Sequence, residues 1–249
     1  MSKIIVNSLA TEYKDEGQGP VILMLHGWWR SLSDFDQVTE SLKSKFRIIR
    51  LDLPGFSGTE MPDQVWNVAD YVEFVRSFLE KIEVRPAILL GHSFGGRIII
   101  RGIGGNKLNA DKLVLISAAG VKTDGWRNKI FMVLAKIADV VTLLPPLLFA
   151  RGKLKHKFYK MIGSDYLESG KMKEIFKAVV AEDLLPFARN IQSPTLLLWG
   201  ESDFVTPLDQ ANLLHKSIKN SSLKIIRGAG HFSHTEKPNK IVEFIEEFV

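Results

Sequence analysis

The sequence of 249 residues contains no cysteine and only six histidines. The lack of cysteine excludes disulfides, thiolate-bound metal centres and a cysteine nucleophile. A metal site would need a visible cluster of histidines and carboxylates, and no such cluster stands out, so we expect neither a metal nor an organic cofactor. A composition of 45% hydrophobic and 24% charged residues excludes a disordered chain.

The sequence also lacks a secretion signal and an uninterrupted apolar run. Its first residues have no basic start, apolar stretch or small-residue cleavage site, which indicates a cytoplasmic protein. The longest nearly apolar stretch, from Ile130 to Ala150, is interrupted by Lys136, Asp139 and Pro145-Pro146. We therefore expect no transmembrane segment.

The net charge of +5 is concentrated in residues 121–190, which carry 13 Lys or Arg against 7 Asp or Glu. A nucleic-acid-binding surface would combine such charge with aromatic residues on a known binding motif, and the sequence shows no such motif. No nucleic acid partner is expected.

Short apolar runs alternate with helical patterns along most of the chain. The runs are rich in Val, Ile and Leu without polar alternation, which is typical of parallel strands buried on both faces. The expected strands are Val21 to Leu25, Phe46 to Leu51, Ala87 to Leu90, Leu113 to Ser117, Thr195 to Trp199 and Leu223 to Ile226. The expected helices are Ser33 to Lys45, Val68 to Ile82, Gly95 to Ile103, Leu208 to Ile218 and Asn239 to Val249. This alternation predicts a doubly wound α/β sheet.

The alternation stops after Gly120 and resumes at Ser193-Pro194. The segment between is too long for an ordinary connection, and it is helix-prone and broken by prolines. We therefore expect residues 1–120 and 191–249 to form the core domain. Residues 121–190 are expected to form a helical cap inserted between two of its strands.

The strongest chemical signal is Gly91-His92-Ser93-Phe94-Gly95, which follows a predicted strand and opens a predicted helix. Glycines on both sides permit a tight turn that holds a serine clear of the sheet, as a nucleophile requires. Ser93 is therefore the candidate nucleophile.

A serine nucleophile needs a base and an acid that orients the base. Asp203 and His231 each follow a predicted strand, and the order Ser, Asp, His is the one this topology requires. Glu201 and His234 are the competing candidates. Asp203 is favoured by the turn that follows it, and His234 is expected to brace the loop. His92 is expected to be a structural neighbour, and His156 and His215 to be surface residues.

The tetrahedral intermediate formed at a serine needs two fixed N–H donors for its oxyanion. In a strand–turn–helix of this kind, called a nucleophile elbow, one donor is the N–H of the residue after the nucleophile. The other donor lies in a turn after an earlier strand. We assign them to Phe94 and to Trp28 of His26-Gly27-Trp28-Trp29.

Taken together, the elbow, the acidic loop, the late histidine and the His-Gly turn resemble the α/β-hydrolase superfamily, in its carboxylesterase-like and lipase-like branch. Asp52-Leu-Pro-Gly-Phe-Ser-Gly-Thr is similar to another loop of that superfamily. The resemblance covers almost the whole chain. It implies an eight-stranded, mostly parallel sheet, a cap after strand six and a cofactor-free Ser-His-Asp site.

A serine at the elbow favours cleavage of a carboxylic ester through an acyl-serine. The expected substrate is a small ester with an apolar acyl group, bound by Trp29 and by Leu147, Leu148 and Phe149 of the cap. Hydrolases of carbon–carbon bonds in meta-cleavage products are the main alternative, although His92, Trp28-Trp29 and Phe232 differ from their usual residues. A non-hydrolytic sensor is a third reading. Peripheral membrane contact through the basic cap and the oligomeric state are left open.

Overall fold

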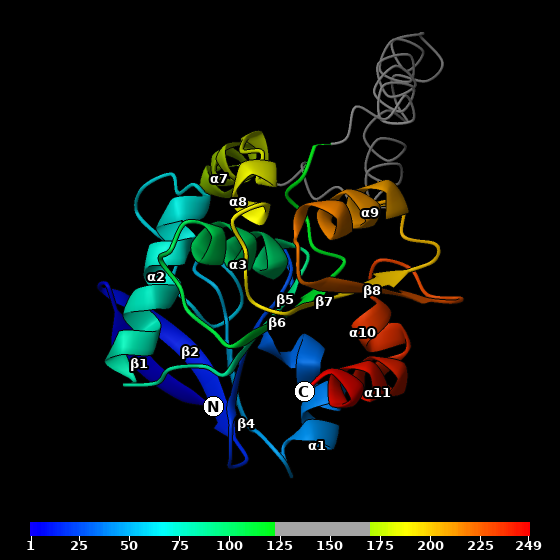
Figure 1. Cartoon of the computed structure of the whole chain (residues 1–249). Coiled ribbons are helices and arrows are strands. Elements are labelled where there is room, and N and C mark those ends of the chain that lie inside the picture. Colours follow the sequence, from blue (N-terminus) through cyan, green and yellow to red (C-terminus); the bar gives the residue numbers. More distant parts are fainter. Residues whose placement is uncertain (123–169) are drawn as a thin grey trace, which may run out of the picture.

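A computed structural model of the protein describes residues 1–122 and 170–249 (Figure 1). Its centre is a sheet with strand order β1-β2-β4-β3-β5-β6-β7-β8. The pairs β1–β2 and β2–β4 are antiparallel, and all other neighbours are parallel. The strands are β1 (Ser2–Val6), β2 (Leu9–Glu16), β3 (Val21–Leu25), β4 (Arg47–Leu51), β5 (Ile88–His92), β6 (Lys112–Ile116), β7 (Thr195–Gly200) and β8 (Ser221–Ile226).

The six strands predicted from apolar runs are all present, with ends that differ by at most two residues. The hairpin β1–β2 was not located from the sequence pattern. Its strands carry many polar residues because they lie at the edge of the sheet, where most side chains are only partly buried. The turn between them places Asn7 and Ser8 at φ of +46° and +68°, the backbone of a tight hairpin.

The helices predicted around these strands are also present. They are α1 (Asp36–Leu42), which follows the 3-10 turn η1 (Leu32–Phe35), then α2 (Val68–Lys81), α3 (Phe94–Gly104), α9 (Leu208–Ser217) and α11 (Pro238–Phe248). The best defined is α2, because its apolar stripe is buried. It begins at a capping box in which the Asn67 side chain accepts from the N–H of Asp70 and the Asp70 side chain accepts from the N–H of Asn67.

Helices cover both faces of the sheet, so the core has two layers. Leu23 and Leu25 of β3 pack in one apolar cluster with α2, α3 and α9, whereas Ile22 and Met24 pack in another with α1 and α11. Alternate residues of a strand point to opposite faces, so a continuous apolar run supplies both layers. Figure 1 shows these two groups of helices on opposite sides of the strands. The fold is the α/β-hydrolase fold.

Between β6 and β7 the described residues include α7 (Lys171–Ala181) and the short α8 (Leu185–Ala188). Arg97 of α3 is buried and donates from one amino group to the carbonyls of Val179 and Glu182, at 2.7 and 2.9 Å. The helix that follows Ser93 therefore holds the end of α7 through Arg97. The limits of the predicted cap, residues 121–190, stay a prediction, and Leu147, Leu148 and Phe149 lie outside the described residues.

Among the described residues, no helix combines the length and the hydropathy that crossing a bilayer requires.

Candidate active site

Ser93 occupies a sharp turn between β5, which ends at His92, and α3, which begins at Phe94. Its φ of +49° and ψ of −102° lie in a sparsely populated region for a residue other than glycine. A Cβ at Gly95 would lie 2.1 Å from the carbonyl oxygen of Leu25, and one at Gly91 would lie 2.5 Å from the carbonyl carbon of Gly95. Both flanking glycines are therefore required by close backbone contacts.

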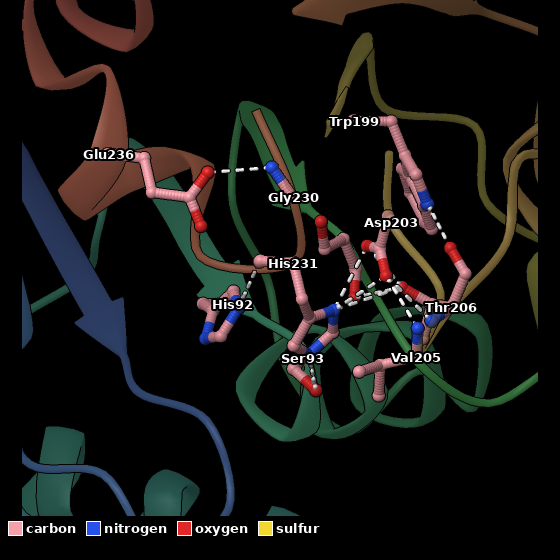
Figure 2. A network of polar contacts seen from close by, with 10 residues as sticks. His92, Ser93, Trp199, Asp203, Val205, Thr206, Gly230, His231 and Glu236 are labelled. Carbon is pink, nitrogen blue, oxygen red and sulfur yellow. Dashed lines mark hydrogen bonds and ion pairs between the residues drawn. The ribbon is translucent and has the colours of Figure 1, made fainter. Parts of the chain in front are cut away.

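His231 links the other two predicted residues (Figure 2). It lies in the loop between β8 and α10 (Ser233–Glu236). Its Nε2 is 3.1 Å from the Oγ of Ser93, and its Nδ1 is 2.9 Å from Oδ2 of Asp203. The structure therefore brings His231 together with Asp203, which is 28 positions away along the chain, and with Ser93, which is 138 positions away.

Asp203 is held in a fixed orientation by the turn that follows β7. The N–H groups of Val205 and Thr206 both donate to its Oδ1 at 2.9 Å, and the hydroxyl of Thr206 donates to its Oδ2 at 2.8 Å. Burial raises the pKa of Asp203, but the hydrogen bond and charge of His231 and the Thr206 N–H outweigh burial and lower it overall. The competing Glu201 is exposed and accepts from the N–H of Gly228 instead.

Trp28 and Phe94, the residues predicted to donate to an oxyanion, lie side by side with ring centroids 5.2 Å apart. Phe94 is the first residue of α3, where an N–H has no acceptor within the helix. Within the described residues, neither its N–H nor that of Trp28 donates to another backbone group. The neighbouring N–H of Gly95 donates to the carbonyl of His26 at 3.0 Å, which fixes the turn after β3 against the start of α3.

An aromatic wall surrounds this turn. The ring of Trp28 lies 4.9 Å from Phe56, 5.0 Å from Phe176 of α7 and 6.3 Å from the predicted substrate-binding residue Trp29. Phe56 and Phe176 were not among the residues predicted to bind substrate. Phe56 stands in the loop similar to one of the superfamily, which could have indicated it, whereas nothing in the sequence marks Phe176.

Three buried histidines, His92, His231 and His234, pack against one another with tilted rings. The ring of His92 lies 4.9 Å from that of His231 and 4.2 Å from that of His234. The Nε2 of His92 is 3.0 Å from the carbonyl oxygen of His231, so this nitrogen carries the hydrogen. His92 therefore fixes the backbone of His231, which agrees with its predicted role as a structural neighbour.

Burial, followed by the charges of His234 and His231, holds the pKa of His92 well below its ordinary value. Burial also lowers the pKa of His234, although Asp34 opposes this effect from 3.7 Å, too far for a direct hydrogen bond. Both rings are therefore neutral near pH 7. His215 is exposed, as predicted, and His156 lies outside the described residues.

Within residues 1–122 and 170–249, no group of three or more histidine, aspartate or glutamate side chains is placed to hold a metal ion.

A serine on a strained strand–turn–helix elbow, hydrogen-bonded through a histidine to an aspartate on a mostly parallel sheet, is typical of hydrolases with a nucleophile elbow. The chain belongs to the Alpha/beta hydrolase family, whose model matches residues 22–244. It is 30% identical to the AB hydrolase superfamily protein YisY of Bacillus subtilis, over 94% of this chain and 93% of that protein.

Solved structures share the fold at lower identity. An esterase from Exiguobacterium antarcticum matches with a TM-score of 0.76 and 22% identity, over 99% of this chain and 98% of that chain. A meta-cleavage product hydrolase from Pseudomonas fluorescens matches with a TM-score of 0.75 and 18% identity, over 100% of this chain and 97% of that chain.

Proposed function

We propose that the protein is a serine hydrolase that cleaves carboxylic esters through an acyl-serine intermediate. The observation that carries this proposal is the hydrogen-bonded series from Ser93 to His231 to Asp203, at 3.1 and 2.9 Å. A base within hydrogen-bond distance activates the otherwise weak hydroxyl nucleophile, and the buried carboxylate orients the base.

In the first half-reaction, Nε2 of His231 takes the proton of Ser93 while the Oγ of Ser93 bonds to the ester carbonyl carbon. Asp203 holds the ring with its proton on Nδ1 and stabilises the imidazolium that forms. The bond from the carbonyl carbon to the leaving oxygen then breaks, and His231 gives its Nε2 proton to that oxygen. The alcohol departs and the acyl group stays on Ser93.

In the second half-reaction, His231 takes a proton from water as the water oxygen attacks the acyl carbon. The bond from that carbon to Ser93 Oγ breaks, Ser93 regains the proton, and the carboxylic acid leaves. The N–H groups of Trp28 and Phe94 stabilise the oxyanion in both halves. One such donor contributes about 2.7–4 kcal/mol to the transition state in comparable sites.

The aromatic wall of Trp28, Phe56, Phe94 and Phe176 supports an apolar acyl group as the part of the substrate beside the serine. Trp29 adjoins this wall through Phe56, at 5.7 Å between ring centroids. We further propose that residues 121–190 form a cap over this site and that Leu147, Leu148 and Phe149 of this cap bind the acyl group. These three residues lie outside the described residues.

The test is labelling by a fluorophosphonate and turnover of p-nitrophenyl esters from acetyl to palmitoyl. We expect Ser93→Ala to lose labelling and at least about 10³-fold in kcat. Ser217→Ala is the matched control, because its hydroxyl donates to the carbonyl of Leu213 on α9. Labelling that persists in Ser93→Ala would refute the proposal.

Two other outcomes distinguish the alternatives. Cleavage of a vinylogous diketone acid with no cleavage of any ester would identify a carbon–carbon bond hydrolase. If the wild-type protein cleaves no ester and is not acylated by an activated ester, it is not an ester hydrolase and the sensor interpretation replaces the proposal.

A further inference from the structure

A polar cavity of about 330 Å³ lies beside the candidate active site, and the mechanism above does not use it. Its lining combines two aromatic rings with hydroxyl groups, a guanidinium group and a carboxylate. The lining residues are Trp29, Arg30, Ser31, Asp34, Phe56 and Ser57.

Ring contacts connect the lining of this cavity with the candidate active site on two sides. On one side, Phe56 belongs to the aromatic wall, with its ring centroid 6.1 Å from that of Phe94. On the other side, the guanidinium of Arg30 lies 4.9 Å from the ring centroid of Phe232, and that ring is 5.2 Å from the ring of His231. Through the ring of Phe232, the Arg30 wall of the cavity is therefore connected to the side of the site that holds the base.

The two charged residues of the lining leave groups free for a ligand. Nε of Arg30 donates to Oδ2 of Asp34 at 2.5 Å. Within the described part of the chain, the terminal amino groups of Arg30 and Oδ1 of Asp34 have no hydrogen-bond partner. The side chain of Asp34 is only 9% exposed, so its carboxylate is held in place at the cavity wall.

The charges select the chemistry of that ligand. Burial raises the pKa of Asp34, but the contacts with His234 and Arg30 outweigh burial and lower it overall, so the carboxylate is ionised near pH 7. The carboxylate of Asp34 would repel an anionic ligand, and the guanidinium of Arg30 would repel a cationic ligand. A neutral hydroxyl group can accept from Arg30 and donate to Asp34 at the same time.

The side on which the cavity lies indicates which part of an ester it receives. His231 hands its proton to the leaving oxygen, so the alcohol portion has to lie on the side of His231. The acyl portion is left for the aromatic wall near Phe176. We propose, building on the proposed function, that the cavity with Arg30 and Asp34 is a subsite for a neutral, polyhydroxylated leaving alcohol.

The experiment compares kcat/KM for three octanoate esters that differ only in the alcohol: glycerol monooctanoate, ethyl octanoate and carboxymethyl octanoate. In the wild-type protein, we expect the glycerol ester to exceed the ethyl ester by at least about tenfold, the worth of one hydrogen bond to a charged group. The carboxymethyl ester is expected to fall below the glycerol ester, because its carboxylate would face Asp34.

The variant is Arg30→Gln, and it is expected to reduce the ratio of glycerol ester to ethyl ester by about tenfold. Arg85→Gln is the matched control, since this exposed arginine is paired with Asp111 at 2.6 Å, away from the cavity. Thermal melting checks that both variants fold. If Arg30→Gln does not fold, the ratio in the wild-type protein still decides, because it involves no substitution.

Three results would overturn the subsite: no preference for the glycerol ester, a ratio unchanged in Arg30→Gln, or a preference for the carboxymethyl ester. These results are separable from failure of the proposed function. If ethyl octanoate is cleaved by the wild-type protein and not by Ser93→Ala, the serine hydrolase stands and only the subsite is wrong.

Discussion

Exchanging Asp203 for asparagine tests the site through a single atom. Oδ1 of Asp203 accepts two backbone N–H groups, from Val205 and Thr206, and lies 3.1 Å from Nδ1 of His231, whereas Oδ2 is the nearer oxygen to Nδ1, at 2.9 Å. In Asp203→Asn the amide oxygen has to stay opposite the two N–H donors. The NH₂ group therefore takes the place of Oδ2 and faces His231.

This NH₂ group donates to Nδ1 of His231, so the ring proton moves to Nε2. Nε2 lies 3.1 Å from the Oγ of Ser93 and, once protonated, can no longer accept the serine proton. The imidazolium also loses its carboxylate. We expect kcat to fall by about 10⁴-fold, the effect of the same exchange in serine proteases, which corresponds to about 5.5 kcal/mol.

The assay is kcat for p-nitrophenyl butyrate at neutral pH, with thermal melting to show that the variant is folded. Glu201→Gln is the matched control, because Glu201 lies in the same loop but is exposed. Its kcat is expected to stay within about twofold of the wild-type value. A loss below about tenfold in Asp203→Asn, or an equal loss in Glu201→Gln, would refute the assigned tautomer and the choice of acid.

The remaining predictions concern the supports of the site and its acid stability. Gly95→Ala should destabilise the protein by several kcal/mol in urea unfolding, because its Cβ would lie 2.1 Å from the Leu25 carbonyl oxygen; near-wild-type stability would contradict this. His92→Leu should lower kcat by about tenfold at unchanged KM, because it removes the N–H that donates to the His231 carbonyl at 3.0 Å. His92→Gln can restore an N–H donor and should recover most of the lost kcat; equal losses in the two variants would argue against a role of His92 in positioning His231. The pKa of Asp203 is lower in the folded protein, so its ionised form stabilises the fold fully above the unfolded pKa near 3.9. This contribution is lost as pH falls through the folded pKa. In Asp203→Asn the free energy of unfolding should therefore decline less steeply below about pH 4, and an unchanged decline would contradict this.

The sheet and its helices were predictable because their signals are local. Strands such as β6 (Lys112–Ile116) consist mostly of apolar residues in a continuous run, and α2 has a buried stripe at helical spacing and a capping box at its start. The hairpin β1–β2 was not located because its strands form no continuous apolar run: β1 is the edge strand, β2 lies between β1 and β4, and most side chains of both strands are partly or fully exposed to water.

The sequence by itself determined the candidate nucleophile, because the two glycines around Ser93 and the flanking strand and helix are consecutive in the chain. It also singled out Asp203 and His231 as candidates, since each follows a strand whose end meets the same edge of a parallel sheet.

Only the tertiary structure decided how these residues are supported. The packing of His92 against His231 and His234, the contact of Phe176 with Trp28 and the cavity at Arg30 join segments that are distant in the chain. Their physical basis is the packing of separate loops at one edge of the sheet. Such contacts cannot be predicted from a local sequence pattern, because neither of the two contacting residues changes the secondary-structure propensity or the hydrophobic periodicity of its own segment.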